Sequence, residues 1–208
     1  MIKRLADEIR DLHAANGSAT GRVLLGLTGC CGSGKSTLAG QLCQILGDEL
    51  KIQAAVLALD GFHFPNRQLN ELGLSQRKGS PATFDLEGFV NHVRSVRDKV
   101  NRDIAVPTYS RELHEPIPGG GTIVASTQVV IVEGNYLLLD GWREVAGLLD
   151  QIWYLDTPLE ECMRRVRDRH RDGGCDQAAA ALKIETNDRL NAELVRTTLP
   201  RADRVIAV

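Results

Sequence analysis

The stretch that decides the fold runs from Gly26 to Gly40 and reads GLTGCCGSGKSTLAG. Its segment from Gly29 to Ser36 fits the pattern GxxxxGK[ST]. The residues just before it, RVLLGLT, are almost all apolar, as expected of a strand buried on both faces of a sheet. After it, leucine and isoleucine recur at the 3.6-residue spacing of a helix. We therefore expect a strand over residues 22–28, a glycine-rich turn, and a helix from Ser36 onward.

A turn so rich in glycine suits the binding of phosphate groups. Glycine tolerates backbone angles that other residues avoid, and without side chains in the way the backbone N–H groups can point at phosphate oxygens. The N-terminus of the following helix adds partial positive charge. We expect Lys35 to reach the β- and γ-phosphates of a nucleotide, Ser36 to coordinate Mg²⁺, and Thr37 to contact an α-phosphate oxygen. The predicted nucleotide-binding residues are Gly29, Gly32, Ser33, Gly34, Lys35, Ser36 and Thr37.

The rest of the chain alternates apolar runs with helical periodicity, which is typical of an α/β fold with a mostly parallel sheet. Four further strands are predicted at residues 54–60, 128–135, 151–156 and 203–208, and helices at about 2–15, 85–99, 142–149, 158–170 and 177–197. The predicted architecture is a P-loop NTPase three-layer sandwich, with a mostly parallel five-stranded sheet and helices on both faces. A length of 208 residues suits a single domain over residues 1–208.

Composition narrows the classes of partner. The formal net charge of −2 gives no global reason to bind nucleic acid or an anionic membrane surface. No run of 18 uncharged apolar residues occurs, and the charged N-terminal segment lacks the pattern of an export signal. The five cysteines have no zinc-ligand spacing and indicate reduced thiols. We therefore expect a cytoplasmic protein with no nucleic-acid partner and no membrane partner.

Two acidic residues end apolar runs of predicted strands at the carboxyl edge of the sheet, where ligands bind in this fold class. Glu133 ends the run VVIVE and is the candidate Mg²⁺ ligand, bound to the ion directly or through one of its ligands. It could instead form a hydrogen bond to the substrate. Asp60 ends the run VLALD and is expected to accept a proton from an attacking hydroxyl, while Gly61 lets the chain turn beside the phosphate site. His63 is an alternative base, although a histidine between two phenylalanines more often packs in a loop or binds substrate.

Two long segments, about residues 60–84 and 104–125, interrupt the alternation, and loops of this length in compact domains are usually functional. The second is flanked by IAVPTYS and TIVAS and should form a wide hairpin. A third segment, about residues 164–175, combines five arginines with two glycines and is expected to form a lid, in which Arg169 and Arg171 stabilise charge on the transferred phosphoryl group. The candidate acceptor-binding residues in the two loops are His63, Arg77, Lys78, Tyr109, Arg111 and His114.

Four motifs follow the glycine-rich turn in order: LALDGFHFP, RKGSPATFD, VPTYSRELHEPIP and VVIVEGNYLLLD. With them the chain resembles the phosphoribulokinase/uridine kinase family from about Leu24 to its final strand, and it looks most similar to the fructose transport system kinases and then to the pantothenate kinases. The resemblance implies ATP as donor, a parallel five-stranded sheet, Asp60 at the position of the family's base, and Tyr109 in a substrate-binding hairpin. Arg111 stands where the pantothenate kinases have a histidine.

The sequence therefore predicts an ATP-dependent kinase that transfers the γ-phosphate of MgATP to a hydroxyl of a small metabolite, with a sugar such as fructose as the first candidate. Lys35 and the lid arginines would gather charge while Asp60 activates the acceptor. One alternative is a pantothenate- or nucleoside-type kinase of the same family. Another is a P-loop nucleoside triphosphate hydrolase or regulatory ATP-binding module, although the NKxD motif of GTPase switches is absent. A homodimer is left open.

Overall fold

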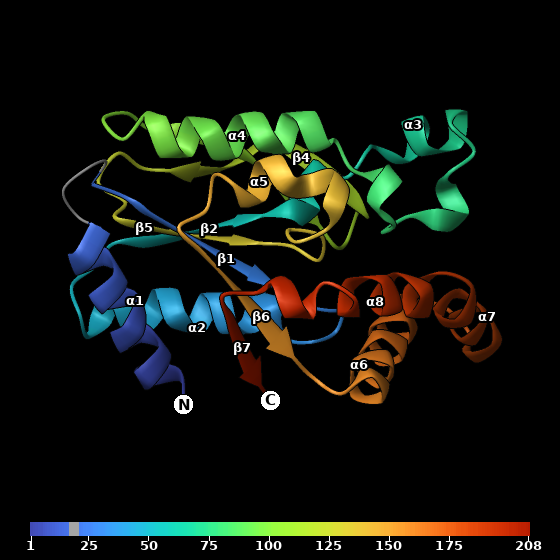
Figure 1. The fold of residues 1–208 in the computed structure, drawn as a ribbon. Coiled ribbons are helices and arrows are strands. Elements are labelled where there is room, and N and C mark those ends of the chain that lie inside the picture. The colour runs from blue at the N-terminus through green and yellow to red at the C-terminus, as the bar shows by residue number, and fades with distance from the viewer. Residues whose placement is uncertain (17–20) are drawn as a thin grey trace.

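The computed structural model describes residues 1–16 and 21–208 and contains the predicted five-stranded sheet (Figure 1). The strands lie in the order β2–β5–β1–β6–β7, and every neighbouring pair is parallel. Their bounds are β1 (Val23–Thr28), β2 (Ala54–Ala58), β5 (Val129–Glu133), β6 (Gln151–Asp156) and β7 (Arg204–Ala207). The α/β prediction is confirmed, and this sheet is parallel throughout.

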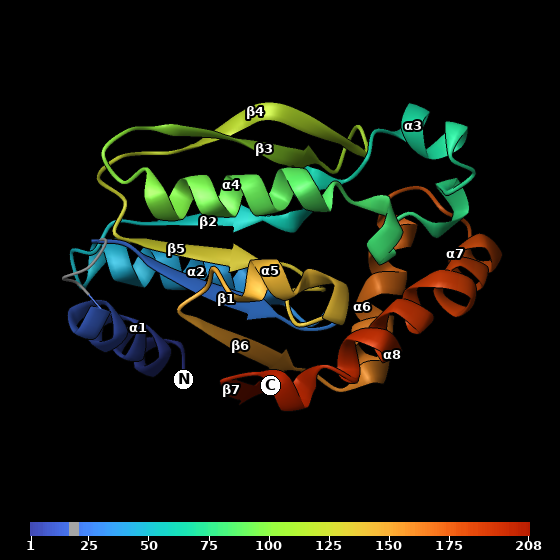
Figure 2. The same cartoon turned by 45° about the horizontal axis from the view of Figure 1, so that its top comes forward.

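Helices cover both faces of the sheet. On one face lie α1 (Ile2–Asn16) and α2 (Lys35–Asp48), and on the other lie α4 (Leu86–Asp98) and the short α5 (Arg143–Ala146), as Figure 1 and Figure 2 show. An apolar cluster fills the space on each face, and successive residues of β1 alternate between the two clusters. A strand with both faces buried needs a continuous apolar run, which is the pattern that the sequence shows there.

Strands β3 (Ile104–Ser110) and β4 (Glu115–Ile123) form a hairpin as predicted, an antiparallel pair separate from the main sheet (Figure 2). The predicted width was wrong: the stretch EPIPGG, expected in the loop, pairs as part of β4, and only residues 111–114 connect the two strands. The carbonyl oxygen of Pro107 faces a 3₁₀ turn at Leu59–Phe62, where a Cβ on Gly61 would lie 2.5 Å from that oxygen. The chain turns at Gly61 as predicted, although Gly61 does not have a positive φ. Gly61 is needed because the turn after β2 and the hairpin approach each other at backbone contact.

The long segment 60–84 is built from short helical pieces, which the sequence did not predict. They are 3₁₀ turns at Leu59–Phe62, Ser75–Arg77 and Pro81–Thr83, and the helix α3 (Asn66–Glu71). A single β-bridge between His63 and Phe84 brings the two ends of the segment together. The segment therefore leaves the sheet after β2 and returns to the same place before α4 begins.

The C-terminal part carries α6 (Leu159–Asp172), α7 (Gln177–Lys183) and α8 (Arg189–Arg196). The sequence predicts one helix over residues 177–197, and in the structure a π-helical turn at Ile184–Asp188 joins α7 to α8. The helix predicted at 142–149 is reduced to α5, because a 3₁₀ turn precedes it and Gly147 ends it. Within the described ranges no helix has both the length and the apolar character needed to cross a membrane.

Gly61→Ala should destabilise the protein by about 1–3 kcal/mol, because the new methyl group would push the hairpin away from the turn that carries Asp60. Gly47→Ala is the matched control: Gly47 lies in α2, and a Cβ there would meet no atom within 4 Å. That change should stabilise by about 0.5–1 kcal/mol through helix propensity. Denaturant unfolding measures both, and a Gly61→Ala protein as stable as the wild type would contradict the close contact.

Candidate active site

The glycine-rich turn between β1 and α2 has the backbone conformation that the sequence predicts. Gly29, Gly32 and Gly34 have φ values of 143°, 83° and 102°, all in the region that favours glycine. Space is limiting as well, since a Cβ on Gly32 would lie 2.4 Å from the carbonyl oxygen of Cys162. Helix α2 begins at Lys35 without a side-chain cap, so its first N–H groups are available to bind an anion.

Lys35 lies over this turn and is largely buried, with 7% of its surface exposed. Its ammonium group donates hydrogen bonds to the carbonyl oxygens of Gly29 at 2.9 Å and Cys30 at 2.8 Å. These two bonds use two of its three hydrogens. The charge is thereby fixed beside the N-terminus of α2, where the phosphates of a nucleotide would add negative charge.

Ser36 and Glu133 meet at the edge of the sheet. The Ser36 hydroxyl lies 2.8 and 3.0 Å from the two carboxylate oxygens of Glu133, the last residue of β5. Burial raises the pKa of Glu133, and the nearby Lys35 charge and the Ser36 hydrogen bond oppose that rise. A hydroxyl and a carboxylate are hard oxygen donors of the kind that Mg²⁺ prefers. The described residues hold no group of three or more His, Cys, Asp or Glu side chains that could bind a metal ion.

Asp60 lies in the 3₁₀ turn that follows β2. It is half-buried, and no side chain in the described part of the protein donates a hydrogen bond to its carboxylate. Its charge helps to raise the pKa of Glu133 and that of Tyr109. Asp60 therefore lies within electrostatic reach of both the Ser36–Glu133 pair and the hairpin.

A polar cluster forms where the long segment meets the hairpin. Lys78 donates to the side-chain oxygen of Asn66 and to the backbone oxygen of His114, both at 2.6 Å, and its ammonium lies 5.5 Å from the ring centre of Tyr109. Burial lowers the pKa of Lys78. Burial, with the charges of Asp60 and Glu115, raises the pKa of Tyr109 to about 12. The cluster thus offers the Lys78 side chain and the Tyr109 phenol as hydrogen-bond donors.

His63 packs between aromatic rings. Its ring centre lies 4.0 Å from that of Phe84 and 5.1 Å from that of Tyr109, and its Nδ1 lies 3.0 Å from the backbone oxygen of Asp60. Burial lowers the pKa of His63, which favours the neutral ring. His63 thus buttresses the turn that carries Asp60.

The other predicted acceptor residues are dispersed. Arg77 donates to the backbone oxygen of Thr186 at 2.9 Å, so it is directed at the π-helical turn. Arg111 and His114 are exposed at the tip of the hairpin, and His114 enters the cluster through its carbonyl oxygen. The charge of Arg111 nevertheless lowers the pKa of Glu133, so it acts on the same region.

Two arginines of α6 contact the glycine-rich turn. Arg169 donates to the sulfur of Cys31 at 2.8 Å, and Arg165 donates to the backbone oxygens of Gly32 and Ser33, both at 3.3 Å. The pKa of Arg169 is raised mainly by the neighbouring Cys31 sulfur, and to a lesser extent by the charge of Asp60. Residues four apart share a helix face, so Arg165 and Arg169 face the turn together.

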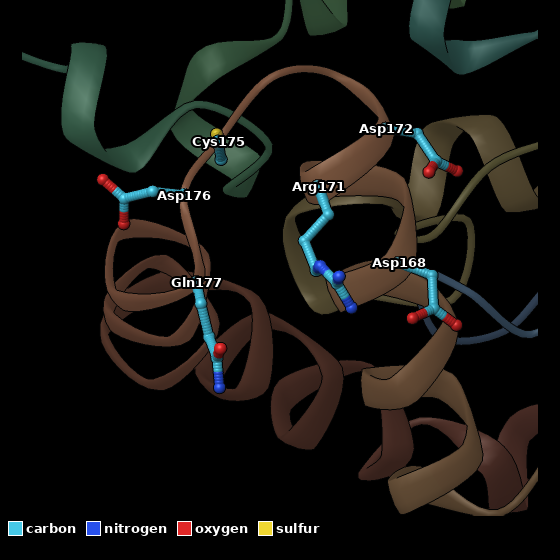
Figure 3. A pocket seen from close by; sticks show the side chains of 6 residues that line it. All are labelled: Asp168, Arg171, Asp172, Cys175, Asp176 and Gln177. Carbon is cyan, nitrogen blue, oxygen red and sulfur yellow. The ribbon is translucent and has the colours of Figure 1, made fainter.

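Arg171 occupies a different place. It helps to line a depression of about 470 Å³ at the α6–α7 junction (Figure 3). Arg171 comes two residues after Arg169, so its side chain points about 200° away around the helix axis. It therefore does not share the helix face of Arg169. The lining residues are Asp168, Arg171, Asp172, Cys175, Asp176 and Gln177.

Arg165, Asn187 and Asp188 lie near the site but are not among the residues selected from the sequence, where Arg165 is one of five lid arginines and the polar residues of the last helix could equally be exposed. The signal for Arg165 was its helical phase with Arg169. The signal for Asn187 and Asp188 is their helical spacing from Ala180, Ile184 and Val195, and the structure shows that both are buried.

The chain is similar to known proteins over most of its length. The phosphoribulokinase / uridine kinase family matches residues 24–208. The structure of a putative fructose transport system kinase from Silicibacter sp. TM1040 is 33% identical and superimposes with a TM-score of 0.89 over 99% of this chain and 98% of that one. A putative uridine kinase of Schizosaccharomyces pombe is 29% identical over 89% of this chain and 83% of its own length.

A pantothenate kinase of Serratia proteamaculans is 30% identical over 66% of this chain but only 46% of its own length. The likeness to pantothenate kinases is therefore restricted to part of those enzymes. The family match, in contrast, extends from β1 to the end of the chain and includes the glycine-rich turn, both acidic strand ends and the hairpin. This chain belongs to the phosphoribulokinase/uridine kinase family and is an ATP-dependent kinase of small molecules.

Proposed function

We propose that this kinase transfers the γ-phosphate of MgATP to a hydroxyl of a small polyhydroxylated metabolite, with a sugar such as fructose as the first candidate. The observation that carries the proposal is the position of Asp60. Its turn follows β2, whose last residue Ala58 pairs with Glu133 on the nucleotide side, and the next residue, Gly61, lies against the hairpin at Pro107. A base for phosphoryl transfer to an alcohol must reach both partners. The sugar is suggested by the name of the similar Silicibacter protein.

On the donor side, the N–H groups of residues 29–37 and the Lys35 ammonium would hold the ATP phosphates. Ser36 and Glu133 would hold Mg²⁺, which when bound neutralises charge on the β- and γ-phosphate oxygens. Arg169 and Arg165 would stabilise charge on the transferred group from the α6 side. For Arg171 to share this role, the end of α6 would have to move over the nucleotide as a lid.

On the acceptor side, Asp60 would accept the proton of the attacking hydroxyl. Lys78 and Tyr109 would donate hydrogen bonds to other hydroxyls of the acceptor, with Arg77, Arg111 and His114 around them. His63, neutral and packed on Tyr109, would fix the position of Asp60 through the backbone. Such positioning of two reactants supplies a large part of the rate in phosphoryl transfer.

The test is ATP turnover measured with and without a panel of acceptors that includes fructose and other sugars, pantothenate and nucleosides. A kinase should be slow alone and many-fold faster with one acceptor. Acceleration by pantothenate or a nucleoside would replace the sugar and keep the reaction. Equal rates with every acceptor would favour a nucleotide hydrolase or a regulatory module instead.

Lys35→Ala and Asp60→Asn should both reduce phosphoryl transfer by about 100-fold or more. Only Lys35→Ala should weaken the binding of an inert ATP analogue, by about tenfold or more, because Lys35 contacts the phosphates and Asp60 the acceptor. Calorimetry for binding and coupled assays for transfer check both. If Asp60→Asn transferred phosphate at the wild-type rate, Asp60 would not be the base.

Glu133→Gln should lose Mg²⁺-dependent transfer yet unfold at a higher temperature than the wild type at pH 7.5 without nucleotide. The folded-state pKa of Glu133 is raised above its ordinary value near 4.5, so its ionisation costs stability as the pH rises through the interval between the two values. Glutamine has no such charge and can still accept the Ser36 hydrogen bond.

The control for this experiment is Glu71→Gln, an exposed acid paired with Arg67 on α3. It should change stability by less than about 0.5 kcal/mol. The advantage of Glu133→Gln over wild type should shrink toward pH 4.5 in thermal unfolding. A Glu133→Gln protein that is less stable than wild type at pH 7.5 would contradict the assignment of burial as the dominant cause.

A further inference from the structure

The helix that runs from α7 through the π-helical turn to α8 buries one stripe of residues against the rest of the protein. Both ends of this stripe are apolar, but its middle is polar. A buried polar side chain costs free energy unless it is hydrogen-bonded, so a helix that only packs would carry apolar residues there. The stripe contains Ala180, Ile184, Asn187, Asp188, Asn191, Ala192 and Val195.

Asn187 is fully buried and binds the long segment at its acceptor end. Its side-chain N–H donates to the backbone oxygen of Lys78 at 2.9 Å, and its oxygen accepts from Asn191 at 3.3 Å. The residues on either side of Lys78 are held as well: Arg77 by the backbone oxygen of Thr186, and Gly79 by the hydroxyl of Tyr136. The backbone that carries the Lys78 ammonium toward Tyr109 is therefore fixed from outside the loop.

Asp188, the next residue, binds a different element. Its carboxylate accepts a hydrogen bond of 2.8 Å from Nε2 of His170 on α6, and about nine-tenths of both side chains is buried. Its charge also acts on the pKa of Arg169, the residue that contacts Cys31 in the glycine-rich turn. Two adjacent residues of one helix thus hold the acceptor loop and the helix that covers the nucleotide turn.

We propose that Asn187 and Asp188 are positioning residues of the kinase: Asn187 fixes the acceptor loop through Lys78, and Asp188 fixes α6 and its arginines through His170. The π-helical turn that contains them is a kind of irregularity often found at functional sites. The inference rests on the proposed function in one respect, that residues 77–79 belong to the acceptor site. It does not depend on which acceptor is used.

The primary test needs no acceptor. Hydrogen–deuterium exchange of the full chain should become about tenfold faster in residues 75–80 for Asn187→Ala, because one buried hydrogen bond that holds them is lost. Affinity for an inert ATP analogue should fall about tenfold for Asp188→Ala and stay within about twofold of wild type for Asn187→Ala. Unchanged exchange at 75–80, or equal loss of nucleotide affinity in both variants, would overturn the proposal.

The matched control is Thr198→Val. Thr198 is buried after the end of the same helix, and its hydroxyl bonds only locally, to the backbone oxygen of Val195. If Asn187 acted merely through stability, Thr198→Val would produce the same pattern of exchange and affinity, and the proposal would fall.

Kinetics with ATP and the acceptor of the panel that accelerates turnover supply a second readout. Asn187→Ala should raise the KM for that acceptor about tenfold and leave the KM for ATP within about twofold. A rise in both KM values together would overturn the assignment of Asn187 to the acceptor side. If wild-type turnover responds to no acceptor, the proposed function fails, and the exchange and affinity measurements still decide the positioning roles.

Discussion

The carboxyl edge of the parallel sheet is the constraint on which the rest of the structure depends. Parallel pairing sets Leu27 of β1 opposite Glu133 of β5, and Glu133 opposite Ala58 of β2. The chain leaves β1 into the glycine-rich turn and leaves β2 into the turn that carries Asp60. Three neighbouring strands therefore deliver the phosphate-binding loop, the acid beside it and the candidate base to one place. The bond from Ser36 to Glu133 ties α2 to the same edge.

This arrangement holds two opposite charges in a largely buried site. Lys35 and Glu133 each expose only 7% of their surface, and burial of a charge is costly unless it is paired and hydrogen-bonded. Lys35 donates hydrogen bonds to carbonyl oxygens of the loop, and Glu133 accepts a hydrogen bond from the Ser36 hydroxyl. A well-packed apolar pair at this place would stabilise the sheet edge at least as well as the two charges. Charges kept there at a cost to stability are the usual mark of a site that serves a ligand.

The parts predictable from sequence are those fixed by local patterns or by strand ends. The β1–turn–α2 unit is contiguous, and its glycines reveal the backbone conformation they must adopt. Glu133 and Asp60 follow apolar strands, and parallel topology alone places them together. Sequence patterns cannot show which arginines contact the nucleotide turn, because five of them lie on α6. Only the orientation of α6 relative to the glycine-rich turn brings Arg165 and Arg169 into contact with it. The sequence indicates that position 61 needs a glycine, but it does not show why. The Pro107 carbonyl that Gly61 contacts lies in the hairpin, far away along the chain.

The two halves of the site differ in how they are assembled, and this explains why sequence reveals the donor sooner than the acceptor. The donor half uses a contiguous turn and the ends of neighbouring strands. The proposed acceptor half joins the segment after β2, the hairpin and the C-terminal helix, largely through side chains bound to backbone oxygens such as those of Lys78 and His114. Small shifts in those contacts would move the hydrogen-bond donors without disturbing the phosphate loop. Since discrimination between polar acceptors rests on a few such bonds, family membership fixes ATP as donor while the acceptor depends on packing details that no short motif records.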